Sequence, residues 1–140
     1  MIIISHRGNL NGPNSCVENH PDSIDFALSC GVDVEVDIRY LDGKIYLGHD
    51  EPQYEIHHQW LIDRCWSLWV HCKNKEALEV RQLNRFYHDK DAAVFTSAGY
   101  LWAYPGNQPL KNSIAVLPEL HNETSDYGVC TDFPFRYRGR

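Results

Sequence analysis

The segment with the clearest capacity for chemistry is a strict alternation of apolar and acidic residues, Val32-Asp33-Val34-Glu35-Val36-Asp37-Ile38. Alternation with a period of two is typical of a β-strand with two unlike faces. Three carboxylates along one face repel one another, so a solvated acidic face is one interpretation of the pattern. A cation over Glu35 and Asp37, whose side chains project the same way roughly 7 Å apart, would remove the repulsion. The alternation therefore favours a metal site on a strand.

Further residues suited to metal binding or to acid and base chemistry are expected at the same edge of a sheet. Enzymes built on parallel sheets place their sites at the carboxyl ends of the strands. A histidine there is otherwise a hydrogen-bonded polar residue, and a glutamate there is otherwise a rim residue. The side chains expected near the carboxyl ends of predicted strands are those of His6, Glu35, Asp37, His71, Lys73 and Glu119.

The elements that must position these residues begin with a strand, a loop, a helix and a second strand. Ile2-Ile3-Ile4 is a β-branched run typical of a buried parallel strand. A helix is predicted to begin at Pro21 and to stop before Gly31, where the acidic strand follows at once. This order predicts a right-handed βαβ unit.

The rest of the chain alternates between predicted strands and helices or short connections. Asp42-Gly43 is a hairpin signal, and Asn74 is suited to cap a helix. The apolar stripe of that helix would be formed by Ala77, Val80, Leu83 and Tyr87. Extended segments are predicted at residues 44–50, 68–73, 93–96, 100–104, 113–117 and 128–131, and a short helix at 60–66. Such an alternation predicts a parallel α/β sheet.

Length and composition limit the class of protein. A chain of 140 residues with ordinary hydrophobic content is expected to form one domain over residues 1–140. Its net charge of −6 disfavours nucleic acid as a partner, and its apolar runs are too short for stable membrane insertion. Its five cysteines are an odd number without CxxC spacing, which favours a reducing cytoplasm over disulfides or a zinc ribbon. The first apolar run lacks a basic leader, so we expect no signal peptide.

An ordered set of short motifs resembles a known family. The motifs are Ser5-His6-Arg7-Gly8, Glu18-Asn19, Phe26-Ala27, Gly31 to Asp37, Asp42-Gly43, His49-Asp50 and Gly128 to Pro134. Their types and order resemble the glycerophosphodiester phosphodiesterases, within the wider group of phospholipase C-like phosphodiesterases, most densely over residues 5–50. The resemblance implies an α/β fold, a TIM-barrel-like parallel β/α barrel. A full barrel needs about 200 residues or more, so we expect a shortened one that lacks several helices.

The resemblance also implies a function and a role for each matching residue. The expected function is that of a metal-dependent phosphoric diester hydrolase acting on a small glycerophosphodiester-like substrate. By position, His6 and His49 would act as acid and base on the phosphodiester, with Mg²⁺ or Ca²⁺ as the cofactor. The other implied roles are phosphate binding by Arg7 and Lys73, metal binding by Glu35 and Asp37, and support of the site by Glu18.

One departure from the family pattern concerns the metal site. The glutamate of the family's Glu-x-Lys strand is replaced here by His71, two residues before Lys73. A nitrogen ligand would favour Mn²⁺ or Zn²⁺ more than a cage of oxygens does, unless His71 supports the site from behind or belongs to the core. Glu119 is expected to supply the missing carboxylate from another strand end.

Two alternatives to a hydrolase stay open on the sequence alone. The first is a non-catalytic module that binds a phosphorylated ligand through the same metal and phosphate pocket, which His71 and the short chain both favour. The second is a lyase that releases a cyclic phosphate. A shortened barrel would also leave exposed apolar flanks that could favour a homodimer.

Overall fold

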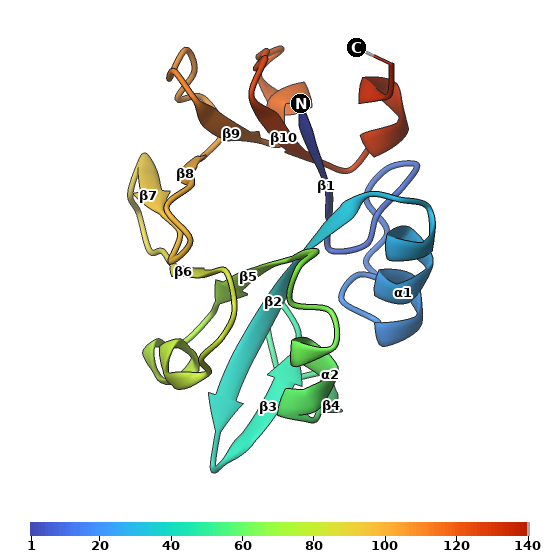
Figure 1. Ribbon diagram of the computed structural model, residues 1–140, viewed down its shortest axis with the longest axis vertical. Helices are drawn as coiled ribbons and strands as arrows, with labels where there is room; N and C mark the ends of the chain where they lie inside the picture. Colours follow the sequence, from blue (N-terminus) through green and yellow to red (C-terminus); the bar gives the residue numbers. More distant parts are fainter. Residues whose placement is uncertain (140) are drawn as a thin grey trace.

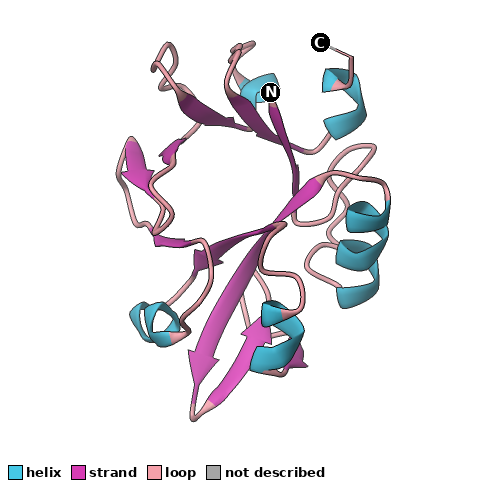
Figure 2. Ribbon diagram, viewed as in Figure 1, coloured by secondary structure: helices cyan, strands magenta, loops and turns pink. Residues whose placement is uncertain are grey.

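The computed structural model describes residues 1–139, which form a curled sheet with helices outside it (Figure 1, Figure 2). The strands are β1 (Ile2–His6), β2 (Asp33–Leu41), β3 (Lys44–Leu47), β4 (Tyr54–Ile56), β5 (Leu68–Cys72), β6 (Arg85–Tyr87), β7 (Ala93–Phe95), β8 (Leu101–Ala103), β9 (Ser113–Val116) and β10 (Gly128–Thr131). The α-helices are α1 (Pro21–Ser29) and α2 (His58–Ile62), and the 3₁₀ helices are η1 (Lys75–Glu79), η2 (Pro118–Leu120) and η3 (Pro134–Tyr137). No helix in this described part of the chain combines the length and apolar character needed to cross a membrane.

The sheet has one long path of strands and one branch. The path follows the order β4-β3-β2-β1-β10-β9-β8-β7, while β5 pairs with β2 and leads on to β6. Most neighbours are parallel, but the pairs β2–β3, β3–β4 and β7–β8 are antiparallel. The strands curl round until β6 and β7 face each other (Figure 1). There the backbone N–H of Ser97 donates to the carbonyl oxygen of Arg85, with 2.8 Å between nitrogen and oxygen.

The expectation of a TIM-barrel-like parallel β/α barrel is wrong. The sheet is mixed, and the described residues form only α1 and α2 as α-helices. The helix predicted after Asn74 is instead the short 3₁₀ helix η1, because the backbone becomes extended at Val80, with φ −75° and ψ 103°. A helical crossover between parallel strands usually takes about a dozen residues or more. The connections 104–112 and 117–127 are shorter, so loops and one 3₁₀ turn replace the barrel's outer helices.

The first βαβ unit is formed as predicted. At the start of α1, the ring Nδ1 of His20 accepts a hydrogen bond from the backbone N–H of Asp22. The helix ends before Gly31, whose φ of 81° lies in the left-handed region that glycine adopts freely. Strands β1 and β2 then pair in parallel. This unit places the first predicted site residues on neighbouring strands.

The acidic strand β2 has the two unlike faces that its alternation predicts. Val34, Val36 and Ile38 are fully buried in a core cluster that includes residues of α1 and α2. Glu35 and Asp37 lie on the other face, which is the inner face of the curl, and are 3% and 0% exposed. The acidic face is therefore buried, and the interpretation as a solvated face does not hold for these two residues.

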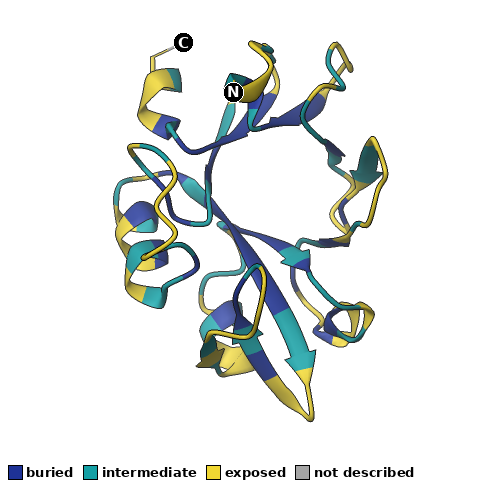
Figure 3. Ribbon diagram, turned by 180° about the vertical axis from the view of Figure 1, so that it is seen from behind, coloured by how far each residue is buried: buried dark blue, intermediate teal, exposed yellow. Residues whose placement is uncertain are grey.

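Apolar side chains from strands all round the curl fill its inner face. They form a second core cluster that includes Ile4, Trp69, Phe86, Trp102, Ile114, Val116 and Cys130. Because side chains alternate along a strand, the residue two positions further on shares the same face. Five residues of this cluster are followed two positions later by a polar residue at or near the end of the strand. These polar residues are His6, His71, His88, Tyr104 and Asp132. Figure 3 shows the buried residues running along the central strands, with the exposed residues in the loops and at the β2–β3 hairpin tip.

Candidate active site

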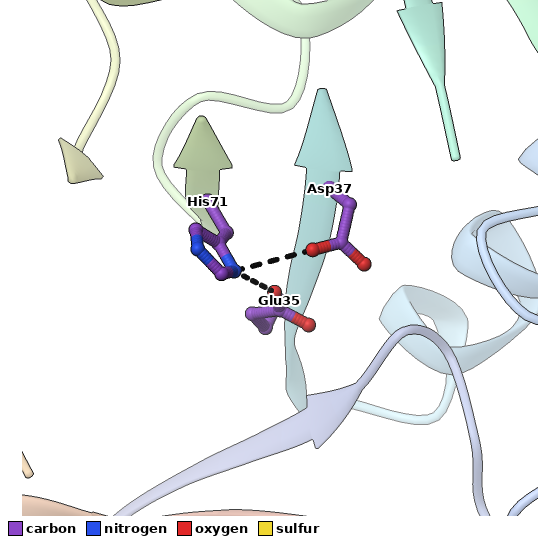
Figure 4. A group of neighbouring side chains, drawn as sticks. All are labelled: Glu35, Asp37 and His71. Atoms are coloured by element: carbon purple, nitrogen blue, oxygen red, sulfur yellow. Dashed lines mark ion pairs between the residues drawn. The ribbon is translucent and has the colours of Figure 1, made fainter. Parts of the chain in front are cut away.

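Three of the predicted metal ligands converge at one point on the inner face. Asp37 on β2 lies beside His71 on β5 in the parallel register, and Glu35 precedes Asp37 by two residues on the same face. The Nδ1 atom of His71 is 3.2 Å from Asp37 Oδ1 and 3.8 Å from Glu35 Oε1 (Figure 4). One ligand atom from each residue lies within 4.8 Å of the other two. The pairing of β2 with β5 therefore assembles this cluster.

The burial and the unpaired atoms of the cluster fit a divalent cation. Burying two carboxylates side by side is costly unless a cation or hydrogen bonds compensate their charge. Glu35 Oε2 is buried without a hydrogen-bond partner. Burial lowers the pKa of His71 even though Asp37 acts to raise it, so the ring is held in the neutral form that binds metals. Two carboxylates and one imidazole suit Mn²⁺ or Zn²⁺ better than oxygens alone do.

The two buried carboxyl groups differ in their affinity for protons. Burial, reinforced by the charge of Asp37, raises the pKa of Glu35 to about 8. Burial also acts to raise the pKa of Asp37, but the nearby His71 ring and the charge of Arg7 hold this pKa well below its usual range. Asn19 Nδ2 donates a further hydrogen bond to Asp37 Oδ2 at 2.9 Å. Without a cation, one carboxyl group is therefore mostly neutral near pH 7 and the other is charged.

His6 is held by an aspartate from the far end of the chain. Its Nδ1 atom lies 2.8 Å from Asp132 Oδ1, and Asn9 Nδ2 donates to the same oxygen at 2.9 Å. Burial alone would lower the pKa of His6, but the hydrogen bond to Asp132 and the charge of Glu35 raise it instead. The ring is thus oriented through Nδ1, which leaves Nε2 for the pocket that His6 lines.

Arg7 lies between two carboxylates. Its Nε atom is 3.1 Å from Asp37 Oδ2, and its Nη1 atom is 3.2 Å from Glu18 Oε2. Glu18 also accepts a hydrogen bond from Asn9 Nδ2 at 2.9 Å. Glu18 therefore holds both Arg7 and the asparagine that contacts Asp132, which is a supporting position of the kind expected for it.

Four of the polar residues at the strand ends, His6, His71, His88 and Tyr104, line a pocket of about 430 Å³. His49 follows β3, its side chain is 37% exposed, and its Nδ1 atom is 2.6 Å from Asp50 Oδ1. Lys73 follows β5, where its backbone N–H donates to the carbonyl oxygen of Ile38 at 2.9 Å. The predicted site residues that line this pocket are His6, Arg7, Glu35, His49, His71 and Lys73.

Glu119, expected as a fourth ligand, does not belong to the metal cluster among residues 1–139. It lies in η2, and both of its carboxylate oxygens are 3.0 Å from the donating hydroxyl of Thr131. The backbone N–H of Asp132 donates to Oε1 of the same carboxylate at 3.0 Å. The expectation is therefore corrected: this carboxylate is committed to the end of β10, where it positions Asp132 instead of a cation.

Several residues of the site were missed by sequence reasoning. His88, Tyr104 and Asp132 each follow an inner apolar residue by two positions, so the strand alternation carried beyond the strand end would have indicated them. Asn9 and Asn19 lie outside the strands, where no such period applies. Their hydrogen bonds to Asp132 and Asp37 depend on the course of the loop after β1.

The site combines a candidate metal centre with histidines, one arginine and one lysine in the same pocket. Imidazoles exchange protons near neutral pH, and Arg and Lys side chains bind anionic oxygens. Such a set is suited to acid and base chemistry on an anionic substrate. Comparisons with protein-family models, with curated proteins and with solved structures found no match for this chain.

Proposed function

We propose that this protein is a metal-dependent phosphodiester hydrolase acting on a small glycerophosphodiester-like substrate, with acid and base catalysis by His6 and His49. The observation that carries the proposal is the cluster of Glu35, Asp37 and His71, whose ligand atoms lie within 4.8 Å of one another. Both proposed catalytic histidines line the same pocket. Its volume of about 430 Å³ suits a small ligand.

Local charge favours an anionic substrate although the chain as a whole is acidic. The net charge is −6, yet Arg7 and Lys73 both line the pocket. The raised pKa of Glu35 removes most of its negative charge near pH 7 when no cation is bound, and Arg7 compensates the charge of Asp37. A phosphodiester, with one negative charge shared by two oxygens, complements this balance.

Side chains of the pocket would hold the cation and compensate the negative charge of the phosphate. Glu35, Asp37 and His71 would hold a divalent cation, which when bound neutralises charge on the non-bridging phosphate oxygens. Arg7 is kept in place by Glu18 and would bind a phosphate oxygen through its remaining guanidinium hydrogens. Lys73 would add a second positive charge at the same pocket.

His6 is suited to be the general acid. Its raised pKa favours the protonated ring, and Asp132 fixes the ring through Nδ1. As the bond between phosphorus and the leaving oxygen breaks, Nε2 would give its proton to that oxygen and the alcohol would leave neutral. His49 would take the proton of the attacking hydroxyl, which belongs to water or to a neighbouring group of the substrate. Attack by the neighbouring group gives a cyclic phosphate that water then opens.

A non-catalytic module that binds a phosphorylated ligand is the second candidate. Arg7 is already engaged with two carboxylates, and the Nδ1 atom of His49 with Asp50. Side chains fixed in this way suit a preformed binding pocket as well as they suit catalysis.

Hydrolysis of bis-p-nitrophenyl phosphate and of glycerophosphodiesters with Mg²⁺, Ca²⁺ or Mn²⁺ separates the two candidates. We expect metal-dependent turnover that His6→Ala and His49→Ala both abolish. His121→Ala is the matched control, because His121 is exposed and does not line the pocket. Unchanged turnover in both pocket variants would remove the two histidines from the mechanism. Absence of turnover with every metal, together with binding of inorganic phosphate, would favour the binding module.

A further inference from the structure

Three polar atoms on the β5, β6 and β8 side of the pocket have no hydrogen-bond partner. They are Nε2 of His71, Nδ1 of His88 and the hydroxyl oxygen of Tyr104, and all three are buried. Each belongs to a side chain that lines the pocket. Buried polar atoms in folded proteins are hydrogen-bonded in the large majority of cases, so three unpaired atoms on adjoining rings point to a group that reaches them from the pocket.

The three side chains are held in place by ring packing. The rings of His88 and Tyr104 stack with their centroids 3.4 Å apart, and the rings of His71 and His88 are 6.1 Å apart. His71 also stacks on Phe86, with 4.9 Å between the ring centroids. Phe86 belongs to the inner core cluster. This packing restrains the rings, so water in the free protein or substrate in the complex is the partner expected for their polar atoms.

The charges around these atoms favour a neutral partner. The Oδ2 atom of Asp91 lies 3.8 Å from Nδ1 of His88, and both carboxylates of the metal cluster lie on β2, next to the strand that carries His71. Burial, with the charges of those carboxylates, holds the pKa of Tyr104 well above its usual range, so its hydroxyl keeps the proton. The carboxylate of Asp91 acts against an anion on this side of the pocket, and Lys73 acts against a cation.

A hydroxyl group matches the hydrogen-bonding capacity of the three atoms. The Tyr104 hydroxyl both donates and accepts, as an alcohol does. The Nε2 atom of His71 is the ring nitrogen away from the carboxylates: it accepts when Nδ1 carries the proton and donates when Nδ1 binds a metal. A partner that both donates and accepts fits either state, which a purely accepting or purely donating group does not.

We propose that His71 Nε2, His88 and Tyr104 form a subsite that binds a hydroxyl group on the alcohol part of the substrate. The inference rests on the proposed function, because the subsite lies in the same pocket that is assigned to the phosphate. His88 and Tyr104 are then specificity-determining residues. A substrate without this hydroxyl leaves their buried polar atoms unpaired and is discriminated against for that reason.

The test compares two probes that differ by one hydroxyl, ethyl phosphate and 2-hydroxyethyl phosphate. Isothermal titration of the Mn²⁺-loaded full chain should give about tenfold tighter binding of the hydroxyl probe. Tyr104→Phe should reduce this preference to about twofold or less, because the hydroxyl probe loses a partner and ethyl phosphate no longer leaves the tyrosine hydroxyl unpaired. His88→Phe keeps a ring for the stack, removes both nitrogens and should act in the same direction. Tyr100→Phe, at the other end of β8, is the matched control and should keep the full preference.

Each outcome of this titration bears on a different claim. Equal affinity of the wild-type chain for both probes would overturn the subsite and leave the phosphate pocket standing. Tighter binding of 2-aminoethyl phosphate or of phosphoglycolate would also overturn it, since the subsite would then take a charged group. Failure of both phosphate probes to bind would overturn the subsite together with the proposed function. A lower Tm or weaker Mn²⁺ binding in Tyr104→Phe would mean that Tyr104 has a structural role. The preference for the hydroxyl probe in His88→Phe, compared with that of the wild type, would then decide whether the subsite exists.

Discussion

His6 and Asp132 stand near opposite ends of the chain, and Nδ1 of the histidine lies 2.8 Å from Oδ1 of the aspartate. The parallel pairing of β1 with β10 brings them together. Asp132 is held in turn by Asn9, which donates to the same oxygen, and by its own backbone N–H, which donates to Glu119. Residues from both ends of the chain thus orient the imidazole of His6, so β1 and β10 must pair before His6 is held in this way.

Asp132→Asn should weaken His6 in its proposed role as general acid without removing it. The amide cannot stabilise a protonated His6 as a carboxylate does, so the pKa of His6 should fall. A general acid must be protonated, so the basic limb of the pH–rate profile should move to lower pH. We expect kcat/KM at neutral pH to fall about 10- to 100-fold. The measurement is the pH dependence of metal-dependent hydrolysis of bis-p-nitrophenyl phosphate.

The control for this prediction is Asp126→Asn, which changes the same charge at an exposed position. It should leave the profile as in the wild type. A loss of activity in Asp132→Asn with no movement of the basic limb would contradict the role of His6 as the acid and leave Asp132 with a purely structural one.

The buried Glu35 makes the stability of the metal-free protein depend on pH. Its pKa is raised to about 8 from an ordinary value of 4.5, so the folded state retains a proton that the unfolded chain releases. The free energy of unfolding should therefore decrease as pH rises from 4.5 to 8, by up to about 1.4 kcal/mol per pH unit. His6, with a raised pKa, acts in the same direction, and His71, with a lowered one, acts against it. Urea unfolding at a series of pH values measures the combined effect of these three groups on the free energy of unfolding.

Glu35→Gln isolates the contribution of this carboxyl group. The amide does not titrate, so the variant should lose the part of the slope that Glu35 causes, while Glu79→Gln, at an exposed position, should not. Excess Mn²⁺ should reverse the wild-type trend above pH 7, because the cation binds only the folded chain and competes with the proton. An identical pH dependence in wild type and Glu35→Gln would contradict the raised pKa.

Local patterns in the sequence predicted the residues of the site better than they predicted the fold. The alternation over 32–38 gave both faces of β2, and the motif resemblance placed His6, His49 and Lys73 in one pocket. The resemblance also implied the β/α barrel that the mixed sheet contradicts. The candidate site residues lie where strands end, and for β1, β2 and β5 the local apolar patterns predicted those strands.

The errors arose where long-range structure overrides local preference. The stripe from Ala77 to Tyr87 has helical spacing, but its last three residues pair with β5 as strand β6, and tertiary pairing prevails over helix propensity there. Glu119 follows a strand as expected, yet hydrogen bonds from Thr131 and Asp132 engage its carboxylate. No local pattern distinguishes a carboxylate that binds a cation from one that binds neighbouring donors.

His71→Glu should change which cation the cluster prefers. The substitution replaces the imidazole beside Asp37 by a third carboxylate, so an all-oxygen ligand set results. We expect the preference for Mn²⁺ over Mg²⁺ or Ca²⁺ to fall about tenfold, with turnover in Mg²⁺ or Ca²⁺ rising correspondingly. Titration calorimetry with each cation measures the affinities, and His121→Glu adds the same charge at an exposed position as a control. An unchanged order of affinities in His71→Glu would mean that the ring does not contact the cation, and that His71 acts only on the carboxylates beside it.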